Sequence, residues 1–354
     1  MQKRLFIPGP THVRDEILKQ MSMSMIGHRS SEFSGIFSET VSKLKRLMYT
    51  SNRVFISSSS GTGLMESAVR NCISKRCLNL VCGHFSGEWH NIAILNGKPA
   101  DSYSIEWGDG FTADSVRERL ESGNYDSLCL THNETSTGVM NPIYEIAEVV
   151  RNFPEVLFMV DAVSSLGGVK LEVDKLGIDV CLTSSQKCLA VPPGISVCSV
   201  SEKALERSKS IPNRGYYFDF QVFLKYYEKQ QTISTPPISQ INALSKQLDH
   251  IFEEGLENRF QRHSRMAEYI RKWALSNFEI FPKEGFWSDT LTVINNSRGI
   301  SFAELNKKLG ERGMTISNGY GKLKEKTFRI AHMGDLQMDD MKELVDNLDD
   351  IIGL

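Results

Sequence analysis

Short apolar runs alternate with amphipathic segments along most of the chain, and this pattern constrains the fold more than any other feature. The runs at 157–160 (LFMV) and 178–182 (IDVCL) are of the kind that forms parallel strands buried on both faces of a sheet. Ahead of the first run, Ile146, Val149 and Val150 recur at helical spacing. Strands that alternate with helices favour a mostly parallel α/β sheet.

Two of these runs lead to charged residues that are candidates for catalysis. Asp161 follows the first run, and the second leads into a polar turn that carries Lys187. Ligands of open α/β sheets bind outside the carboxyl ends of the strands. A lysine that forms a Schiff base and an aspartate that keeps a pyridine nitrogen protonated suit pyridoxal 5'-phosphate. Taken singly, the two residues also fit an acid that closes a strand and a solvated turn lysine.

Length and charge set the general class of the protein. A chain of 354 residues is too long for one ordinary core, so we expect an N-terminal arm at 1–15, a large domain at 16–250 and a small domain at 251–354. The net charge of −2 gives no reason to expect nucleic acid or an anionic membrane as partner. No apolar run approaches the roughly 18 residues of a membrane span.

The cysteines indicate the compartment. There are seven, and no two form a CxxC pair, which argues against zinc and redox motifs. An odd number without a signal peptide fits reduced thiols in a cytoplasmic protein.

A run of small residues after the strand at 53–56 predicts a phosphate site. The turn 57–63 (SSSSGTG) precedes a helical pattern, and this arrangement points free backbone N–H groups at an anion. Ser60, Gly61 and Thr62 are the candidates. A simple capped helix start explains the same residues.

Two further strand ends carry candidate ligand contacts. Phe85 follows the strand at 78–82 and could stack on a flat ring, although a core phenylalanine fits as well. The loop 131–138 (THNETSTG) is dense in hydrogen-bonding groups, as expected of a loop that contacts a polar ligand.

The second half of the chain predicts an interface and a small α+β unit. Residues 213–231 are rich in aromatic side chains, which suits a subunit interface. One long helical pattern then runs from Ile241 to Trp273. In the strand at 327–331, Arg329 alternates with apolar neighbours and needs an anionic partner if it is buried. An edge-strand arginine in solvent is the alternative.

Together these pieces resemble one family closely. The chain is similar over almost its whole length to the class V aminotransferases of the alanine–glyoxylate and serine–pyruvate group, which have fold type I of pyridoxal-phosphate enzymes. No single motif is decisive, but their order and spacing are specific. The motifs are PGP at 8–10, GHR at 27–29, SSGTG at 59–63, HNETSTG at 132–138, VDAVSS at 160–165, SQK at 185–187, PPG at 192–194, STPP at 234–237, GYGK at 319–322 and FRIAHMG at 328–334.

The resemblance implies roles for individual residues. Lys187 matches the lysine that binds pyridoxal 5'-phosphate and moves the substrate proton, and Asp161 matches the partner of the pyridine nitrogen. Arg329 matches the arginine that grips the substrate α-carboxylate. The other implied cofactor contacts are Ser60, Gly61 and Thr62 with Gln186 at the phosphate, Phe85 and Val163 on the ring faces, Thr135 near the phenolic oxygen, and Thr235 with Thr232 reaching the phosphate of a neighbouring subunit.

The resemblance also implies the reaction and the assembly. We expect ping-pong transamination in a homodimer, with alanine or serine as donor and glyoxylate or pyruvate as acceptor. Cys188 departs from the small or apolar residues that are commoner after the lysine, and either packs silently or tunes the site. Thr232 stands where some relatives have Tyr, which puts that contact in doubt.

Several other functions stay open at this point. Another donor, such as 2-aminoethylphosphonate or aspartate, and a lyase use the same fold and cofactor. A cysteine desulfurase would carry His before the lysine and a mobile Cys, whereas this chain has Gln186 and no Cys before Arg329. A non-catalytic relative would not need Lys187, Asp161 and Arg329 together.

Overall fold

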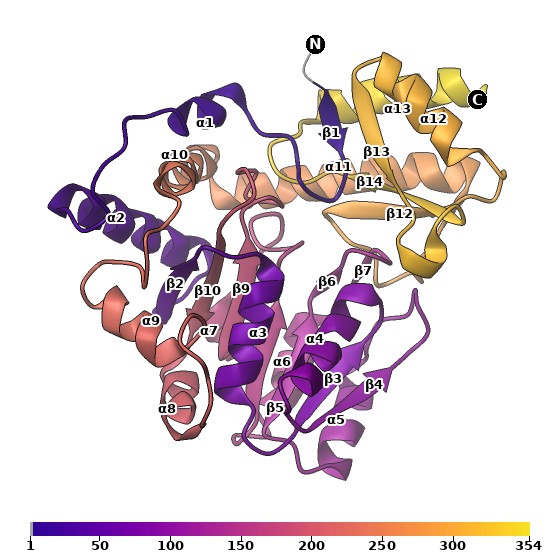
Figure 1. Cartoon of the computed structure of the whole chain (residues 1–354). Coiled ribbons are helices and arrows are strands. Elements are labelled where there is room, and N and C mark those ends of the chain that lie inside the picture. The colour runs from indigo at the N-terminus through magenta and orange to yellow at the C-terminus, as the bar shows by residue number, and fades with distance from the viewer. Residues whose placement is uncertain (1–2) are drawn as a thin grey trace.

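A seven-stranded sheet forms the centre of the larger part of the molecule (Figure 1). The computed structural model describes residues 3–354. The strands follow the order β2-β10-β9-β8-β5-β3-β4, and β10 alone runs antiparallel to its neighbours. The predicted mostly parallel α/β sheet is therefore confirmed. The bounds are β2 Arg53–Ser57, β3 Cys77–Val81, β4 Ala100–Ser104, β5 Ser127–Thr131, β8 Leu157–Asp161, β9 Val180–Ser184 and β10 Ser196–Val200.

Helices cover both faces of this sheet because its strands are apolar on both sides. In β5, Leu128 and Leu130 face one core and Cys129 faces the other. Within the large part of the chain the helices are α1 Asp15–Gln20, α2 Ser31–Leu47, α3 Gly61–Cys72, α4 His84–Leu95, α5 Ala113–Ser122, α6 Ile143–Val150, α7 Val173–Leu176, α8 Glu202–Ser210, α9 Phe220–Tyr227 and α10 Ile238–Glu254. No helix among the described residues is long and apolar enough to cross a membrane.

A smaller five-stranded sheet with the order β1-β13-β14-β12-β11 packs against α11, α12 and α13. It lies beyond the carboxyl ends of the large sheet, where the hairpin of β6 and β7 approaches β12 (Figure 1). The elements are β1 Arg4–Phe6, β6 Asn133–Glu134, β7 Val139–Met140, α11 Leu256–Asn277, β11 Glu279–Ile280, β12 Leu291–Asn295, α12 Phe302–Glu311, β13 Met314–Asn318, a 3-10 turn Gly321–Leu323, β14 Thr327–Ala331 and α13 Met338–Ile352.

The structure differs from the sequence-based expectations at three places. The long helical pattern is broken into α10 and α11 by Gly255, whose φ of +84° no helix allows. The N-terminal arm contributes β1, which pairs in parallel with β13 of the small sheet. The aromatic segment 213–231 includes α9, whose Phe220 and Phe223 pack on Phe55 in the core, while Tyr216 is exposed. The predicted division into residues 1–15, 16–250 and 251–354 stays a prediction.

Candidate active site

Asp161 is the last residue of β8, so it lies where the carboxyl ends of the parallel strands meet. It is 4% exposed, and the Val163 N–H donates to its Oδ1 at 2.7 Å. Burial, helped by the nearby carboxylate of Glu134, raises the pKa of the Asp161 carboxyl to about 7. No lysine or arginine among the described residues forms an ion pair with it. A carboxylate in this position is suited to a cationic partner that the chain itself does not supply.

Lys187 lies in the turn after β9, against the N-terminal arm. Its Nζ donates to the carbonyl of Pro8. A Cβ on Gly9 would lie 2.6 Å from Lys187 Cδ, so Gly9 is needed for this close approach. The Thr11 hydroxyl donates to the Lys187 carbonyl at 3.0 Å, and the Thr11 N–H donates to the Gln186 carbonyl at 3.0 Å. The arm, expected only to be fixed and extended, therefore holds the lysine turn on one side.

The Lys187 amine has a lowered pKa. Desolvation, together with the positive charge of Arg329, lowers the pKa to about 8. Its side chain is still partly accessible to solvent. An amine with a pKa near 8 is partly neutral at physiological pH, as a nucleophile or a base must be.

The turn before α3 has the features of an anion site. Ser60 is the residue that precedes the helix, and its side chain makes no capping hydrogen bond to α3. The simple capped start is therefore not what the structure shows. A Cβ on Gly61 would lie 2.7 Å from Val163 Cγ2, so the start of α3 touches the segment after Asp161. Ser60 and Thr62 are exposed.

A buried hydroxyl without a partner lies in the same place. Ser184, at the end of β9, has an Oγ atom with no hydrogen-bond partner within the described chain. It lies 3.6 Å from the position of a Cβ on Gly61. Buried polar atoms are normally paired, so an unpaired one beside a free helix N-terminus is suited to a bound ligand.

Phe85 and Glu134 form one unit at the start of α4. Phe85 is half-buried, unlike the core phenylalanines, and its ring centroid lies 5.2 Å from that of Tyr320. The Glu134 carboxylate is fully buried and accepts from the backbone N–H groups of Phe85 at 3.3 Å and Ser86 at 2.7 Å. A Cβ on Gly83 would lie 2.3 Å from Glu134 Cγ. The sequence signal for Glu134 was its place in the 131–138 loop, but its partner Gly83 could not be found without the fold.

Arg329, in β14, is buried beside the same loop. Its Nε donates to the Asn318 carbonyl at 2.9 Å and its Nη1 to the Thr135 carbonyl at 3.2 Å. The Tyr320 ring centroid lies 5.4 Å from the guanidinium carbon. Burial lowers the pKa of Arg329 to about 10. Among residues 3–354 it has no carboxylate partner, so its outward face is free for an anion.

The remaining predicted residues divide into two groups. The Thr135 hydroxyl lies 2.5 Å from that of Ser164, and Val163 and Gln186 are half-buried at the same edge. Within the described chain, neither Thr232 nor Thr235 forms a hydrogen bond with Lys187. Thr232 donates to the Ser234 carbonyl in its own loop at 2.7 Å, and Thr235 is exposed.

Cys188 lies under the site rather than in it. It is fully buried with Leu291 and Val293, and its thiol donates to the Ser164 carbonyl at 3.5 Å. Burial raises the pKa of this thiol to about 12, so it stays protonated. These contacts favour packing over a chemical role.

Comparisons with known proteins agree with this arrangement. Residues 11–322 match the family described as aminotransferase class V. The chain is 41% identical to an uncharacterised aminotransferase of Methanocaldococcus jannaschii over 94% of this chain and 88% of that protein. It is 31% identical to a serine–glyoxylate aminotransferase of Arabidopsis thaliana, over 94% and 86%.

The fold comparison gives the same answer. The crystal structure of an alanine–glyoxylate aminotransferase from Nostoc sp. superposes with a TM-score of 0.93 at 29% identity, covering 99% of this chain and 96% of that one. The predicted fold type I of pyridoxal-phosphate enzymes is confirmed. With a family match across most of its length and relatives above 30% identity, the chain belongs to the class V aminotransferases.

Proposed function

We propose that the protein binds pyridoxal 5'-phosphate through Lys187 and transfers an amino group from alanine or serine to glyoxylate or pyruvate. The observation that carries the proposal is a group of three charged residues, a buried carboxylate, a half-buried lysine and a buried arginine, that form no ion pair within the described chain. These are Asp161, Lys187 and Arg329. Such perturbed groups gather at functional sites.

The residues present fit the cofactor. The free N-terminus of α3, with Ser60, Gly61, Thr62 and Gln186, would hold the phosphate, and the unpaired Ser184 hydroxyl supports this. Phe85 and Val163 would contact the two ring faces, and Thr135 the phenolic oxygen. Asp161 would pair with the pyridine nitrogen. When bound, pyridoxal phosphate supplies an electron sink for negative charge on the substrate α-carbon.

The remaining chemistry belongs to the side chains. Arg329 would hold the substrate α-carboxylate with its free face, which fixes the orientation of the α-carbon. The Lys187 amine, with its pKa near 8, would take the α-proton as a base and return it as an acid. The same groups would serve the amino acid first and the 2-oxo acid second, which is a ping-pong sequence.

The surroundings of Arg329 favour a small neutral donor. Its neighbours are two backbone carbonyls and the Tyr320 ring, with His84 beyond at a ring distance of 4.7 Å from Tyr320. Aspartate carries a second carboxylate, and 2-aminoethylphosphonate carries a doubly charged phosphonate in place of the α-carboxylate. The groups that contact Arg329 in the described chain include no second cation for such a group. The names of the serine and alanine relatives support the same choice, whereas an L-aspartate–glyoxylate aminotransferase of Paracoccus denitrificans, 32% identical to this chain, keeps aspartate as the alternative donor.

Three alternatives have less support. A desulfurase needs a mobile nucleophilic cysteine, but all seven cysteines are buried and Gln186 precedes the lysine. A lyase of the same fold would cleave its substrate and release the products without a second 2-oxo acid, and only a kinetic test separates it from a transaminase. A non-catalytic relative would have no use for an unpaired Arg329.

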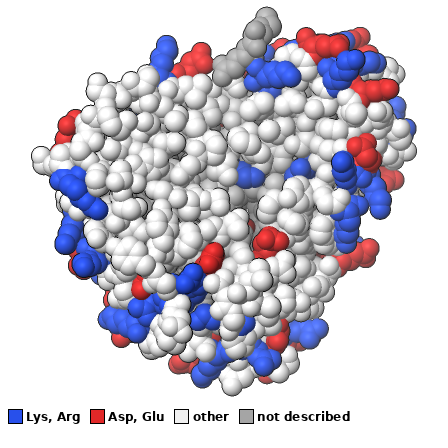
Figure 2. Space-filling model, in the orientation of Figure 1, with Lys and Arg blue, Asp and Glu red and all other residues white. Residues whose placement is uncertain are grey.

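We further propose a cytoplasmic homodimer in which the loop of Thr232 and Thr235 reaches the partner's site, with Thr235 rather than the buried Thr232 as the contacting residue. Thr235 is exposed, as that role requires. Met25 and Tyr216, which are 68% and 61% exposed, are large side chains that such an interface could cover. Figure 2 shows a face whose charged side chains gather mainly near its rim, with a largely uncharged centre, which suits an interface.

A donor panel tests the proposed function. Protein loaded with pyridoxal phosphate is mixed separately with L-alanine, L-serine, L-aspartate and 2-aminoethylphosphonate, and the visible absorbance band is followed. Alanine or serine should bleach the band, and glyoxylate or pyruvate should restore it. Bleaching by aspartate or the phosphonate alone would contradict the donor assignment, and ammonia release without restoration would indicate a lyase.

A further inference from the structure

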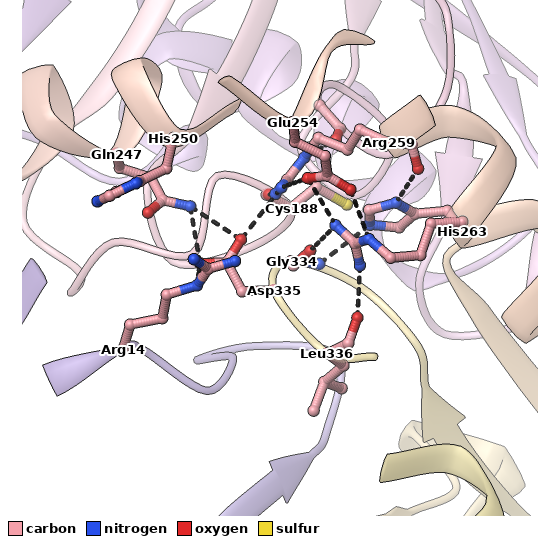
Figure 3. Close-up of polar contacts among 12 residues, drawn as sticks. Arg14, Cys188, Gln247, His250, Glu254, Arg259, His263, Gly334, Asp335 and Leu336 are labelled. Atoms are coloured by element: carbon pink, nitrogen blue, oxygen red, sulfur yellow. Dashed lines mark hydrogen bonds and ion pairs between the residues drawn. The ribbon is translucent and has the colours of Figure 1, made fainter. Parts of the chain in front are cut away.

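Arg259, near the start of α11, donates four hydrogen bonds from a fully buried position. It is 1% exposed. Its guanidinium bonds the carbonyls of Gly167 and Cys188, each at 2.8 Å. It also bonds Glu254 Oε2 at 2.9 Å and Asp335 Oδ1 at 3.1 Å. Figure 3 shows this guanidinium at the centre of a network that joins segments distant in the sequence.

The two carbonyls belong to the segments that carry the proposed catalytic residues. Cys188 directly follows Lys187, so the bond to its carbonyl fixes the peptide next to the lysine. Gly167 lies six positions after Asp161, at the end of the turn that follows β8. One planar group therefore sets the distance between the two turns.

The carboxylate of Asp335 extends the network to the third catalytic segment. Asp335 lies six positions after Arg329, just beyond β14. Besides Arg259 it accepts from Arg14 Nε at 2.9 Å and from Gln247 Nε2 at 2.9 Å (Figure 3). Arg14 belongs to the arm whose Thr11 holds the Lys187 carbonyl.

Neighbours on α11 fix the same loop without touching the lysine turn. Arg262 shares Glu254 with Arg259 and donates to the Gly334 carbonyl at 3.1 Å. The Gly334 N–H donates to His263 Nε2 at 3.1 Å (Figure 3). Within the described chain, Arg262 forms no hydrogen bond with Gly167 or Cys188. It is thus a natural control for Arg259.

From these contacts we propose that Arg259 is a positioning residue, which holds the Lys187 turn in register with the segments of Asp161 and Arg329. The inference rests on the proposed function of those three residues. Arginine is required because its rigid fork reaches two carbonyls and two carboxylates at once. Lysine keeps the charge but has a single donor atom, so it cannot hold both turns. A misplacement of about 1 Å lowers an enzymatic rate by roughly a hundredfold.

The test compares Arg259→Lys with the control Arg262→Lys in the protein loaded with pyridoxal phosphate. Single-turnover bleaching by L-alanine or L-serine gives a maximal rate constant and an apparent dissociation constant. Visible circular dichroism of the resting protein reports how the cofactor is held. For Arg259→Lys we expect a rate constant at least tenfold lower, a dissociation constant within threefold of wild type, and a dichroism band that loses at least half its intensity. Arg262→Lys should keep the rate constant within threefold and the band unchanged.

The outcomes separate the two proposals. A wild-type protein that shows no cofactor band overturns the proposed function, and this inference with it. A cofactor-loaded Arg259→Lys protein with wild-type rate and dichroism but a lower Tm overturns the inference alone, because Arg259 is then merely structural. Equal defects in both variants overturn it too.

Asp335→Asn covers the case in which Arg259→Lys does not fold. It weakens the charged link to the Arg329 segment and leaves both carbonyl bonds of Arg259 in place. It should lower the rate constant at least threefold with an unchanged dichroism band. An unchanged rate constant would overturn the proposed coupling.

Discussion

Replacing Glu134 with Gln changes one oxygen to an NH₂ group in a carboxylate that accepts four hydrogen bonds. The carboxylate is fully buried and has no cationic partner among the described residues. Its Oε1 accepts from the Phe85 and Ser136 N–H groups and from the Ser136 hydroxyl, and its Oε2 accepts from the Ser86 N–H at 2.7 Å. Glu134 thereby fixes the start of α4 and with it Phe85.

The size of the effect follows from this bond pattern. A glutamine oxygen can replace Oε1, but its NH₂ group then faces the Ser86 N–H, and two donors meet. A buried donor left without a partner costs about 1–3 kcal/mol, and three bonds lose their charge assistance. The total is about 2–5 kcal/mol. With an unfolding entropy of about 2.1 cal/mol/K per residue, a chain of this length loses roughly 3–7 °C in Tm.

Thermal unfolding of the cofactor-free protein measures this loss. Glu148→Gln is the matched control, because Glu148 is exposed on α6 and its carboxylate forms no hydrogen bond in the described chain. We also expect weaker binding of pyridoxal phosphate to the Glu134→Gln protein, since Phe85 loses its anchor. A Tm within 1 °C of the control would refute the reasoning.

Three further predictions concern the ionised groups. Only the neutral amine reacts, so the rate at which cofactor-free protein takes up pyridoxal phosphate should rise with pH around the Lys187 pKa of about 8. Stopped-flow absorbance measures this rate, and a pH dependence with its midpoint near 10.5 would contradict the prediction. The Asp161 pKa is raised from 3.8 to about 7, so the folded state holds the proton more tightly than the unfolded state. Cofactor-free wild type should therefore lose stability relative to Asp161→Asn as the pH rises from about 4 to about 7, and the difference should stay level above pH 7. Urea unfolding measures this, and a stability difference that does not change with pH would disprove it. Arg329→Lys removes a bidentate hydrogen bond to the substrate carboxylate and should lower kcat/KM for the amino donor about 30- to 100-fold in steady-state assays. In the control Arg271→Lys, at an ion pair on α11, kcat/KM should stay within threefold of wild type.

The local parts of this account could be predicted from the sequence. Apolar runs gave the central strands, and their ends placed Asp161 and Lys187 at one edge because parallel strands share a carboxyl end. The polar strand β4 at the sheet edge and the short β1 lacked such a signal. β1 pairs with a segment more than 300 positions away, and no local pattern encodes that pairing.

Residues that act through distant contacts were the ones missed. Glu134 was visible only as part of a polar loop, because its partners Phe85 and Ser86 lie about fifty positions earlier. Arg259 falls within a helical pattern and looks like a surface charge, yet it is fully buried against segments of three different strands. The α10–α11 break was overlooked because Gly255 is a single residue in a strongly periodic stretch.

The central claim is that Lys187 carries the cofactor, and reductive trapping tests it most directly. Protein loaded with pyridoxal phosphate is reduced with borohydride, digested, and analysed by peptide mass spectrometry. The account predicts a phosphopyridoxyl mass on the peptide that contains Lys187, in near one-to-one amount with the protein, and none at that peptide when L-alanine or L-serine is added before reduction. A modification spread over other lysines, or a Lys187 peptide that stays unmodified, would contradict the account.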